Sequence, residues 1–224
     1  MSTYIGIPRI PTTRRAGVTD GQARILRMAC SLLLDYPDEG LADKLAAVRS
    51  ETPLLPAEIA GRLEAFCAVA DEWGVRGLQE HYVETFDQRR RCALSLTYYS
   101  HGDKRSRGIA ILAFKEVMRR RGFEAARDEL PDHLPVVLEF CALDESDIGG
   151  QMLAANREGL EVLRTALRSA GSPYSHLLEA LVLTLPEPDE RTLAGYRRLV
   201  SQGPPTELVG AGDLDATLFP VPER

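Results

Sequence analysis

The sequence has few cysteines, and no two of them lie close together. Its 224 residues include Cys30, Cys67, Cys92 and Cys141, and no pair falls within twenty residues of each other. This spacing excludes a CxxC knuckle and a zinc ribbon. Three of the four lie in apolar stretches, where a free cysteine behaves as a small hydrophobic side chain. We therefore expect unpaired structural cysteines, no disulfide framework and no metal site.

Long apolar runs are also missing. No stretch of 18 residues is continuously apolar, so no transmembrane helix is expected. Arg14-Arg15 resembles the start of a twin-arginine export signal. Arg24 and Arg27, however, interrupt the apolar region that such a signal needs. We expect a cytoplasmic protein that does not insert into the membrane.

The usual catalytic and nucleotide-binding motifs are absent. The sequence contains no GxGxxG, no GxxxxGK[ST], no GxSxG and no HExxH. The paired carboxylates Asp71-Glu72 and Asp144-Glu145 lie at predicted helix ends, which is typical of solvated or capping charges. A nucleotide-hydrolysing enzyme would need a phosphate loop or a set of metal-binding carboxylates, and neither is visible. We expect no enzyme and no catalytic residues.

The composition is that of an ordinary globular protein, but its charge is uneven. Apolar residues make up 44% and charged residues 27%, and the net charge is −6. An acidic chain disfavours bulk binding to nucleic acid or anionic membranes. Residues 88–127 nevertheless hold eleven basic and three acidic residues, a charge of +8, which leaves −14 on the other 184 residues. One localised contact with an anionic group remains compatible with this distribution.

Apolar residues recur at helical spacing along most of the chain, and no alternating β pattern of useful length is present. The fold class predicted is all-α, a single compact helical bundle of about nine or ten helices. We expect an irregular N-terminal arm over 1–19, a helical domain over 20–202 and a flexible C-terminal tail over 203–224. The segment 122–131 is a plausible hinge between two halves.

Several helices carry more specific expectations. Asp20 is the predicted N-cap of the first helix, and Gly74 is expected to end the third. Residues 104–121 have a wide apolar face, which predicts a central and largely buried helix, with Gly122 ending it in a left-handed conformation. One long helix is expected to run from about Ile148 to Gly171, and a last one is expected to begin at Asp189.

The first segment of functional interest is Tyr82-Val83-Glu84-Thr85-Phe86-Asp87, followed by Arg89-Arg90-Arg91. Tyr82 and Phe86 are four residues apart, so they share a helix face. That face either packs in the core or forms an aromatic groove for a partner helix, with the arginines at its rim.

The second segment is Glu129-Leu130-Pro131-Asp132-His133-Leu134-Pro135. Asp132 is the predicted N-cap of the following helix, with its bond going to the Leu134 amide, because Pro135 has no N–H to donate. Two carboxylates and an imidazole held between two prolines are more than a helix start requires. A binding role is the alternative.

Both segments carry a family resemblance. The stretches YVETFDQRRRCALSLTYYSHGDKRSRG and ELPDHLPVVLEF are similar to NarJ-type nitrate reductase assembly chaperones, within the TorD/DmsD group of redox-enzyme maturation proteins. The resemblance runs from about residue 24 to 143. The aromatic signature of the family maps onto Tyr82, Phe86 and Asp87, and its E-x-P-D-H signature maps onto Glu129, Pro131, Asp132 and His133. The turn over 98–103 is also similar.

This resemblance implies an all-helical cytoplasmic chaperone of a respiratory nitrate reductase. Such a protein binds the N-terminal segment of the apo catalytic (molybdenum) subunit and delays membrane docking. It assists insertion of the bis-molybdopterin guanine dinucleotide cofactor without binding a cofactor stably itself. We hypothesise that the client segment is an amphipathic helix whose apolar side lies against Leu78, Tyr82 and Phe86. Asp132 and His133 would hold its polar end. A basic rim would border the site, formed by Arg89, Arg90, Arg91, Lys104 and Arg105.

A small helical DNA-binding regulator is the alternative from another class. Its support is the run of cations within 104–121. The apolar breadth predicted for that helix argues against its lying exposed in a DNA groove, and no helix-turn-helix spacing stands out.

Overall fold

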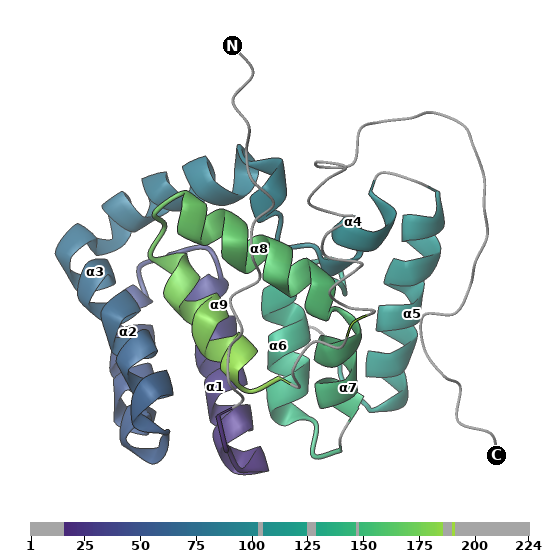
Figure 1. Cartoon of the computed structure of the whole chain (residues 1–224), viewed down its shortest axis with the longest axis horizontal. Coiled ribbons are helices and arrows are strands. Elements are labelled where there is room, and N and C mark those ends of the chain that lie inside the picture. The colour runs from purple at the N-terminus through teal and green to yellow at the C-terminus, as the bar shows by residue number, and fades with distance from the viewer. Residues whose placement is uncertain (1–15, 103–104, 125–128, 147, 186–189, 191–224) are drawn as a thin grey trace.

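The computed structural model describes residues 16–102, 105–124, 129–146, 148–185 and 190. Nine α-helices lie within these residues: α1 (Asp20–Leu34), α2 (Leu41–Glu51), α3 (Ala57–Tyr82), α4 (Leu96–His101), α5 (Ser106–Arg120), α6 (Leu134–Leu143), α7 (Ile148–Ala155), α8 (Arg157–Ser169) and α9 (Tyr174–Leu183). Three short turns join them: η1 (Thr52–Leu54), η2 (Val83–Asp87) and η3 (Arg90–Cys92). The described part of the chain contains no strand, so the all-α prediction is confirmed (Figure 1).

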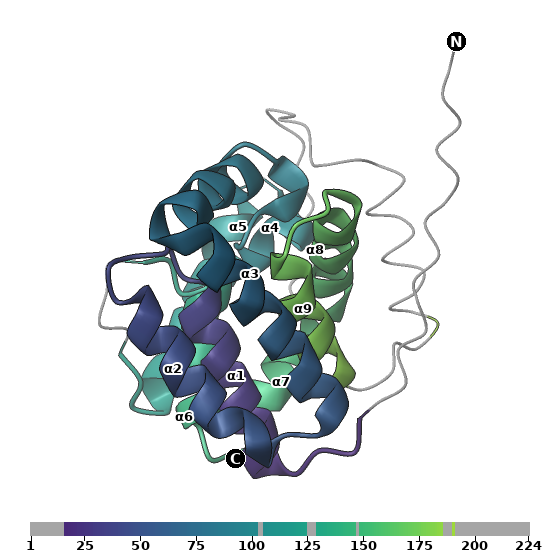
Figure 2. The same cartoon turned by 90° about the vertical axis from the view of Figure 1, so that its left-hand side faces the viewer.

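Helix α1 is the centre of the bundle. It packs against α6, α9 and α2, and Figures 1 and 2 show it surrounded by these neighbours. Its buried stripe includes Leu26, Cys30, Leu33 and Leu34. The predicted N-cap was one residue off, because Thr19 caps the helix through a capping box with Gln22. Asp20 is the first helical residue.

Helix α3 is bent at Gly74, where the prediction placed a helix end. Gly74 has φ 64° and ψ −178°, a conformation that side chains with a Cβ rarely adopt. The bend changes the helix direction before Leu78 and Tyr82. The last turn then passes into η2, a π-helical turn closed by the bond from Gln88 N to Val83 O at 3.2 Å.

The long helix predicted over 148–171 is two helices. Asn156, with φ −100° and ψ 15°, separates α7 from α8, and its side-chain amide donates to Met152 O at 2.8 Å. That bond satisfies a carbonyl at the end of α7. Gly171 ends the region in the left-handed conformation with φ 65°.

Helix α5 differs from its prediction in burial. It packs mainly on α4 at the edge of the molecule, and Figure 1 shows it outermost. Ala110, Phe114 and Met118 are its buried residues, whereas Ile109 is 58% and Leu112 is 64% exposed. One side of the apolar face packs on the rest of the molecule, and the other side stays exposed. Because the helix is exposed, its apolar breadth no longer argues against nucleic-acid binding.

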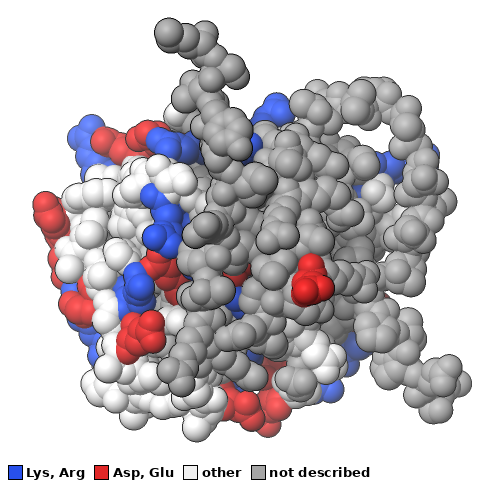
Figure 3. All heavy atoms as spheres, in the orientation of Figure 1, with Lys and Arg blue, Asp and Glu red and all other residues white. Residues whose placement is uncertain are grey.

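Charges of both signs alternate over the α2 and α3 side of the molecule (Figure 3). Arg49 bonds Glu64 at 3.2 Å and Asp71 at 2.6 Å, and Arg76 bonds Glu80 at 3.1 Å.

Several predicted features lie outside the described residues: most of the N-terminal arm, the helix from Asp189, the C-terminal tail, Lys104 and part of the hinge over 122–131. At the described end of the arm, Ala16 N bonds Leu183 O at 2.8 Å.

Candidate functional site

The aromatic residues of the first motif form a packed cluster. The rings of Tyr82 and Phe86 are 4.6 Å apart, and Tyr174 of α9 lies 4.8 Å from Phe86 and 5.9 Å from Tyr82. Tyr82 is 7% exposed, Phe86 9% and Leu78 1%. The shared face is therefore real, and these side chains belong to the core at the junction of α3 and α9.

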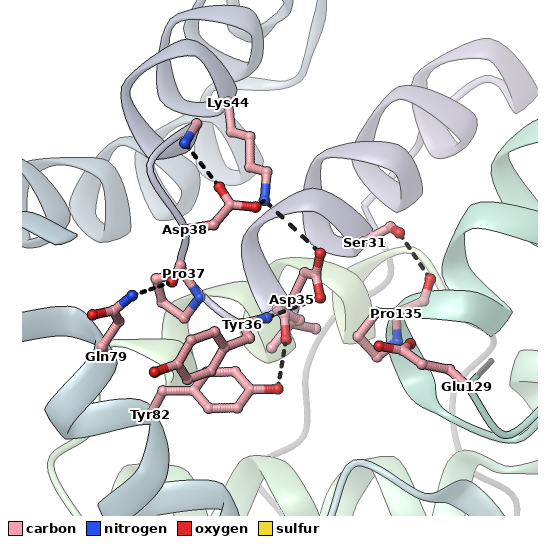
Figure 4. A network of polar contacts seen from close by, with 12 residues as sticks. Ser31, Asp35, Tyr36, Pro37, Asp38, Lys44, Gln79, Tyr82, Glu129 and Pro135 are labelled. Atoms are coloured by element: carbon pink, nitrogen blue, oxygen red, sulfur yellow. Dashed lines mark hydrogen bonds and ion pairs between the residues drawn. The ribbon is translucent and has the colours of Figure 1, made fainter. Parts of the chain in front are cut away.

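The end of α1 covers this cluster (Figure 4). Tyr82 Oη donates to Leu34 O at 3.3 Å, and the ring of Tyr36 meets the ring of Tyr82 edge-on at 5.3 Å. Gln79 donates from its side chain to Pro37 O at 2.8 Å. These bonds satisfy carbonyl groups at and just after the last turn of α1, so the α1–α2 connection is tied to the end of α3.

The second motif reaches the same place. Ser31 Oγ donates to Pro135 O at 2.8 Å, which joins the start of α6 to the last turn of α1 (Figure 4). Burial, and then the negative charges of Asp35, Asp87 and Glu129, raise the pKa of the Tyr82 phenol well above its usual range. The two motifs, about forty residues apart in sequence, thus both lie against the end of α1.

Asp132 does not cap α6 as predicted. It is fully buried, and its Oδ2 accepts from Ser95 Oγ, from Thr97 Oγ1 at 2.5 Å and from Thr97 N at 3.3 Å. It therefore caps α4 from a distant part of the chain. The Leu134 amide is already bonded to Leu94 O at 2.8 Å, and His133 is the N-cap residue, without a side-chain bond to the helix.

Glu129 and His133 form the accessible part of the second motif. His133 Nδ1 donates to Glu129 Oε2 at 2.8 Å, and both side chains are partly exposed. Pro131 is also partly exposed between them. The motif thus divides into a buried structural carboxyl, Asp132, and a polar pair that meets solvent.

Three exposed apolar residues beside these motifs were missed by the sequence reasoning. Tyr36 is 46% exposed, Val83 36% and Leu130 51%. Val83 and Leu130 lie within the two motifs, but Tyr36 was predicted only to mark the end of a helix. Its signal was the Tyr-Pro-Asp sequence that follows the most apolar turn of α1. Its place against Tyr82 depends on tertiary packing.

Carboxylates lie in the same segments as these exposed apolar residues. We call Tyr36, Val83, Asp87, Glu129 and Leu130 the acidic–aromatic patch; Asp35, Tyr82 and Phe86 of the same segments are buried. Lys44 partly balances its α1 side, at 3.8 Å from Asp35 and 3.0 Å from Asp38. Asp87 is exposed and has no ion-pair partner among the residues that the structure describes. The patch can therefore attract a segment that is apolar and positively charged.

The predicted basic rim is only partly placed beside the patch. Arg89 bonds Glu84 at 2.8 Å on the turn that carries Phe86 and Asp87, and Arg90 and Arg91 are exposed in η3. Arg105 is exposed at the start of α5, and none of the described polar contacts joins it to the patch.

The tyrosine-rich turn has a structural role. Tyr99 of α4 shares its one hydroxyl proton between two acceptors, Arg91 O at 3.0 Å and Ala93 O at 2.8 Å. A Cβ at Gly159 of α8 would lie 2.9 Å from Tyr99 Cδ2, so this glycine permits close packing of the two elements. Gly102 ends the turn with φ 58°.

Neither a metal site nor a membrane span is found among the described residues. They hold no group of three His, Cys, Asp or Glu side chains arranged for a metal ion. No described helix combines the length and apolar character needed to cross a membrane.

Comparisons with known proteins agree on one family. The sequence profile described as nitrate reductase delta subunit matches residues 52–180. The Bacillus subtilis nitrate reductase molybdenum cofactor assembly chaperone NarJ is 32% identical over 75% of this chain and 90% of its own length. Escherichia coli K12 NarJ is 30% identical over 68% of this chain and 66% of its own.

Two further likenesses concern domain context and fold. The nitrate reductase-like protein NarX of Mycobacterium tuberculosis H37Rv is 36% identical over 71% of this chain, which spans only 24% of NarX. A solved Archaeoglobus fulgidus structure, described as a redox enzyme maturation protein, superposes with a TM-score of 0.55 at 23% identity. The superposition covers 75% of this chain and 97% of that one. This second likeness shows the fold alone.

Proposed function

This chain belongs to the nitrate reductase delta subunit family, and on that premise we propose that it is an assembly chaperone of a nitrate reductase, not an enzyme. In this proposal it acts in the cytoplasm on the apo catalytic subunit. It binds the N-terminal segment of that subunit and holds the subunit competent for insertion of bis-molybdopterin guanine dinucleotide. The bound segment is withheld from membrane docking until the cofactor is loaded.

The convergence of the two motifs on the end of α1 is the observation that carries this proposal. Burial in the aromatic cluster fixes the end of α3, and both motifs are bonded to the end of α1, through Tyr82 Oη to Leu34 O and through Ser31 Oγ to Pro135 O. A surface assembled from three separate segments of the chain depends on the whole fold. Such a surface suits recognition of a client peptide, because no part of it requires a reaction.

The patch also indicates what the client segment should look like. Tyr36, Val83 and Leu130 offer exposed apolar surface, and Asp87 and Glu129 add negative charge in the same segments. An amphipathic helix with an apolar side and a few cations would match both features. The acidic charge makes the expected client basic at this contact.

The buried residues of the site support the patch from behind. Leu78, Phe86 and Asp132 have little or no exposed surface, so a client helix would first meet Tyr36, Glu129 and His133. Direct contact with Leu78 or Phe86 would require the end of α1 to move off Tyr82. The weak bond from Tyr82 Oη to Leu34 O, at 3.3 Å, is what such a movement would break.

The basic rim is a separate part of the proposal. Arg89, Arg90, Arg91, Lys104 and Arg105 would meet acidic client surface or the phosphates of the cofactor during its insertion. Replacing the arginine triplet with glutamine should weaken client binding more at low salt than at high salt. Equal weakening at both salt concentrations would assign the triplet to solvated surface.

Calorimetric titration tests the patch itself. The probe is a synthetic peptide of the N-terminal segment of a nitrate reductase catalytic subunit, titrated into the full chain. Tyr36→Ala should weaken its affinity by about tenfold, as removal of an aromatic anchor does, and Asp87→Asn with Glu129→Gln should reduce the salt dependence of binding. Leu54→Ala, at another exposed apolar residue, is the matched control. Unchanged affinity in both patch variants would contradict the assignment.

A further inference from the structure

Helix α5 has an exposed apolar surface that is bordered mainly by cations. Ile109 and Leu112 are 58% and 64% exposed and lie three residues apart on one side of the helix. Gly108 beside them is exposed, and no atom lies within 4 Å of the place where a Cβ on it would stand, so the surface is open there. Nothing in the described part of the chain covers this surface.

Cations border these two residues. Arg105 and Lys115 are exposed. Arg119 and Arg120 are also exposed, and they share Glu116 through bonds of 2.9 and 2.8 Å. Glu116 neutralises only one of these four cations. Arg105, Lys115, Glu116, Arg119 and Arg120 together therefore carry +3. We call Arg105, Ile109, Leu112, Lys115 and Arg119 the α5 face.

The other exposed large apolar residues have acidic neighbours in sequence. Leu54 lies between Glu51 and Glu58, and Trp73 follows Asp71-Glu72. Leu143 has charges of both signs beside it, because Arg24, Arg27 and Arg121 bond the segment that carries Asp144 and Glu145. Tyr36, Val83 and Leu130 belong to the acidic–aromatic patch. Among these exposed apolar surfaces, the α5 face has the largest excess of positive charge in its surroundings, so it is the one that would best attract an acidic segment.

We propose that residues 207–223 of the same chain bind the α5 face. This segment contains Glu207, Asp213, Asp215 and Glu223 and no lysine or arginine, a charge of −4. Its apolar residues match the apolar part of the face: Leu208, Val209, Leu214, Leu218, Phe219 and Val221. The charge and the apolar content both complement α5, and the charge disfavours the acidic–aromatic patch.

The chain is long enough for this contact. Twenty-one residues, 186–206, separate the end of the described core from the acidic segment, and they can span up to about 70 Å. A folded core of this size is only about 40 Å across. Length therefore permits the contact with any surface, and the charge selects α5. A tether of this kind supplies an effective concentration of about millimolar, so weak complementarity is sufficient.

Disulfide trapping in the full chain tests this inference independently of any client. Leu112→Cys is combined in turn with Leu208→Cys, Leu214→Cys and Leu218→Cys, because the register of the contact is open. Native thiols should interfere little, since all four native cysteines are buried. Burial also raises the pKa of Cys67 to about 11 and of Cys30 to about 12, which keeps both thiols protonated. Leu54→Cys, paired with the same three partners, controls for chance encounters along the tether.

We expect at least one Leu112→Cys pair to close within the chain about tenfold faster than its Leu54→Cys control. Lys115→Glu with Arg119→Glu should remove most of that difference, whereas Arg76→Glu, at an exposed arginine on α3, should not. Equal closure rates for the two sets would overturn the inference. Predominant cross-linking between chains, seen as a dimer by mass spectrometry, would also overturn it, because the occupant would then be a second copy.

Discussion

At the residue scale, Asp132 is a fully buried carboxyl through which the second motif is bonded to the start of α4. Its sequence context predicted a cap for the helix that begins at Leu134. Its carboxyl instead accepts three hydrogen bonds from Ser95 and Thr97 and joins the second motif to α4. The local sequence drew attention to Asp132, but the groups that donate to its carboxyl lie 35 to 37 positions away in the chain.

Loss of this carboxyl should destabilise the fold strongly. Asp132→Ala leaves the Thr97 amide and two hydroxyl groups without their acceptor in a buried place, which should cost about 2 to 4 kcal/mol of unfolding free energy. Asp87→Ala, at an exposed carboxylate of the first motif, should change it by less than about 0.5 kcal/mol. Urea unfolding of both variants measures this. Equal effects would mean that the Asp132 bonds contribute little.

His81 predicts a pH dependence of stability. Its Nε2 lies 2.8 Å from Ser172 Oγ and 3.1 Å from Thr85 Oγ1. Burial lowers its pKa below the usual 6.5, with Arg89 adding to the effect and Glu84 opposing it. The unfolded state therefore binds the proton more readily, and stability is lost as the pH falls below 6.5 toward the folded-state pKa.

Urea midpoints at pH 7.5 and pH 5.5 test this effect of His81. The wild-type midpoint should fall more steeply between these pH values than the midpoint of His81→Gln, which retains hydrogen-bonding capacity without a proton to gain. Parallel decreases in the two proteins would show that other groups set the pH dependence.

At the element scale, periodicity predicted where most helices lie in the sequence. It did not predict how deeply each helix is buried or which elements it contacts. Thr19, Gly122 and Gly171 mark boundaries close to those predicted, because caps and left-handed residues are local signals. The short α4 and the break at Asn156 were not foreseen. Asp132, a distant residue, holds α4, whereas the break at Asn156 is closed by the local bond of its side chain to Met152 O.

Two glycines of α3 should respond oppositely to alanine. Gly74 has φ 64°, so Gly74→Ala forces a strained backbone and should cost about 1 to 3 kcal/mol, despite the open space around it. Gly61 lies in the helical part of α3 with no atom near its Cβ position, so Gly61→Ala should stabilise by about 0.5 to 1 kcal/mol. Thermal unfolding measures both. Stabilisation by Gly74→Ala would mean that the bend is not required.

At the scale of the whole molecule, the sequence was enough for the fold class, the approximate number of helices and the two motifs. It could not show that the two motifs meet, because that depends on how α1 packs between α6 and its other neighbours. The charge asymmetry was visible, but its arrangement was not. The basic segment is divided between η3, beside the patch, and the outer helix α5. Family membership, in turn, favours a chaperone over a DNA-binding regulator.

In the proposed function, the two motifs form one surface that binds the client segment. Hydrogen exchange with mass spectrometry on the full chain, with and without the catalytic-subunit peptide, locates that surface directly. We expect added protection in three places together: residues 34–38, 82–88 and 129–133. Protection confined to other elements, such as α5 or α2, with these three segments unchanged at saturating peptide, would contradict the claim that the motifs form the binding surface.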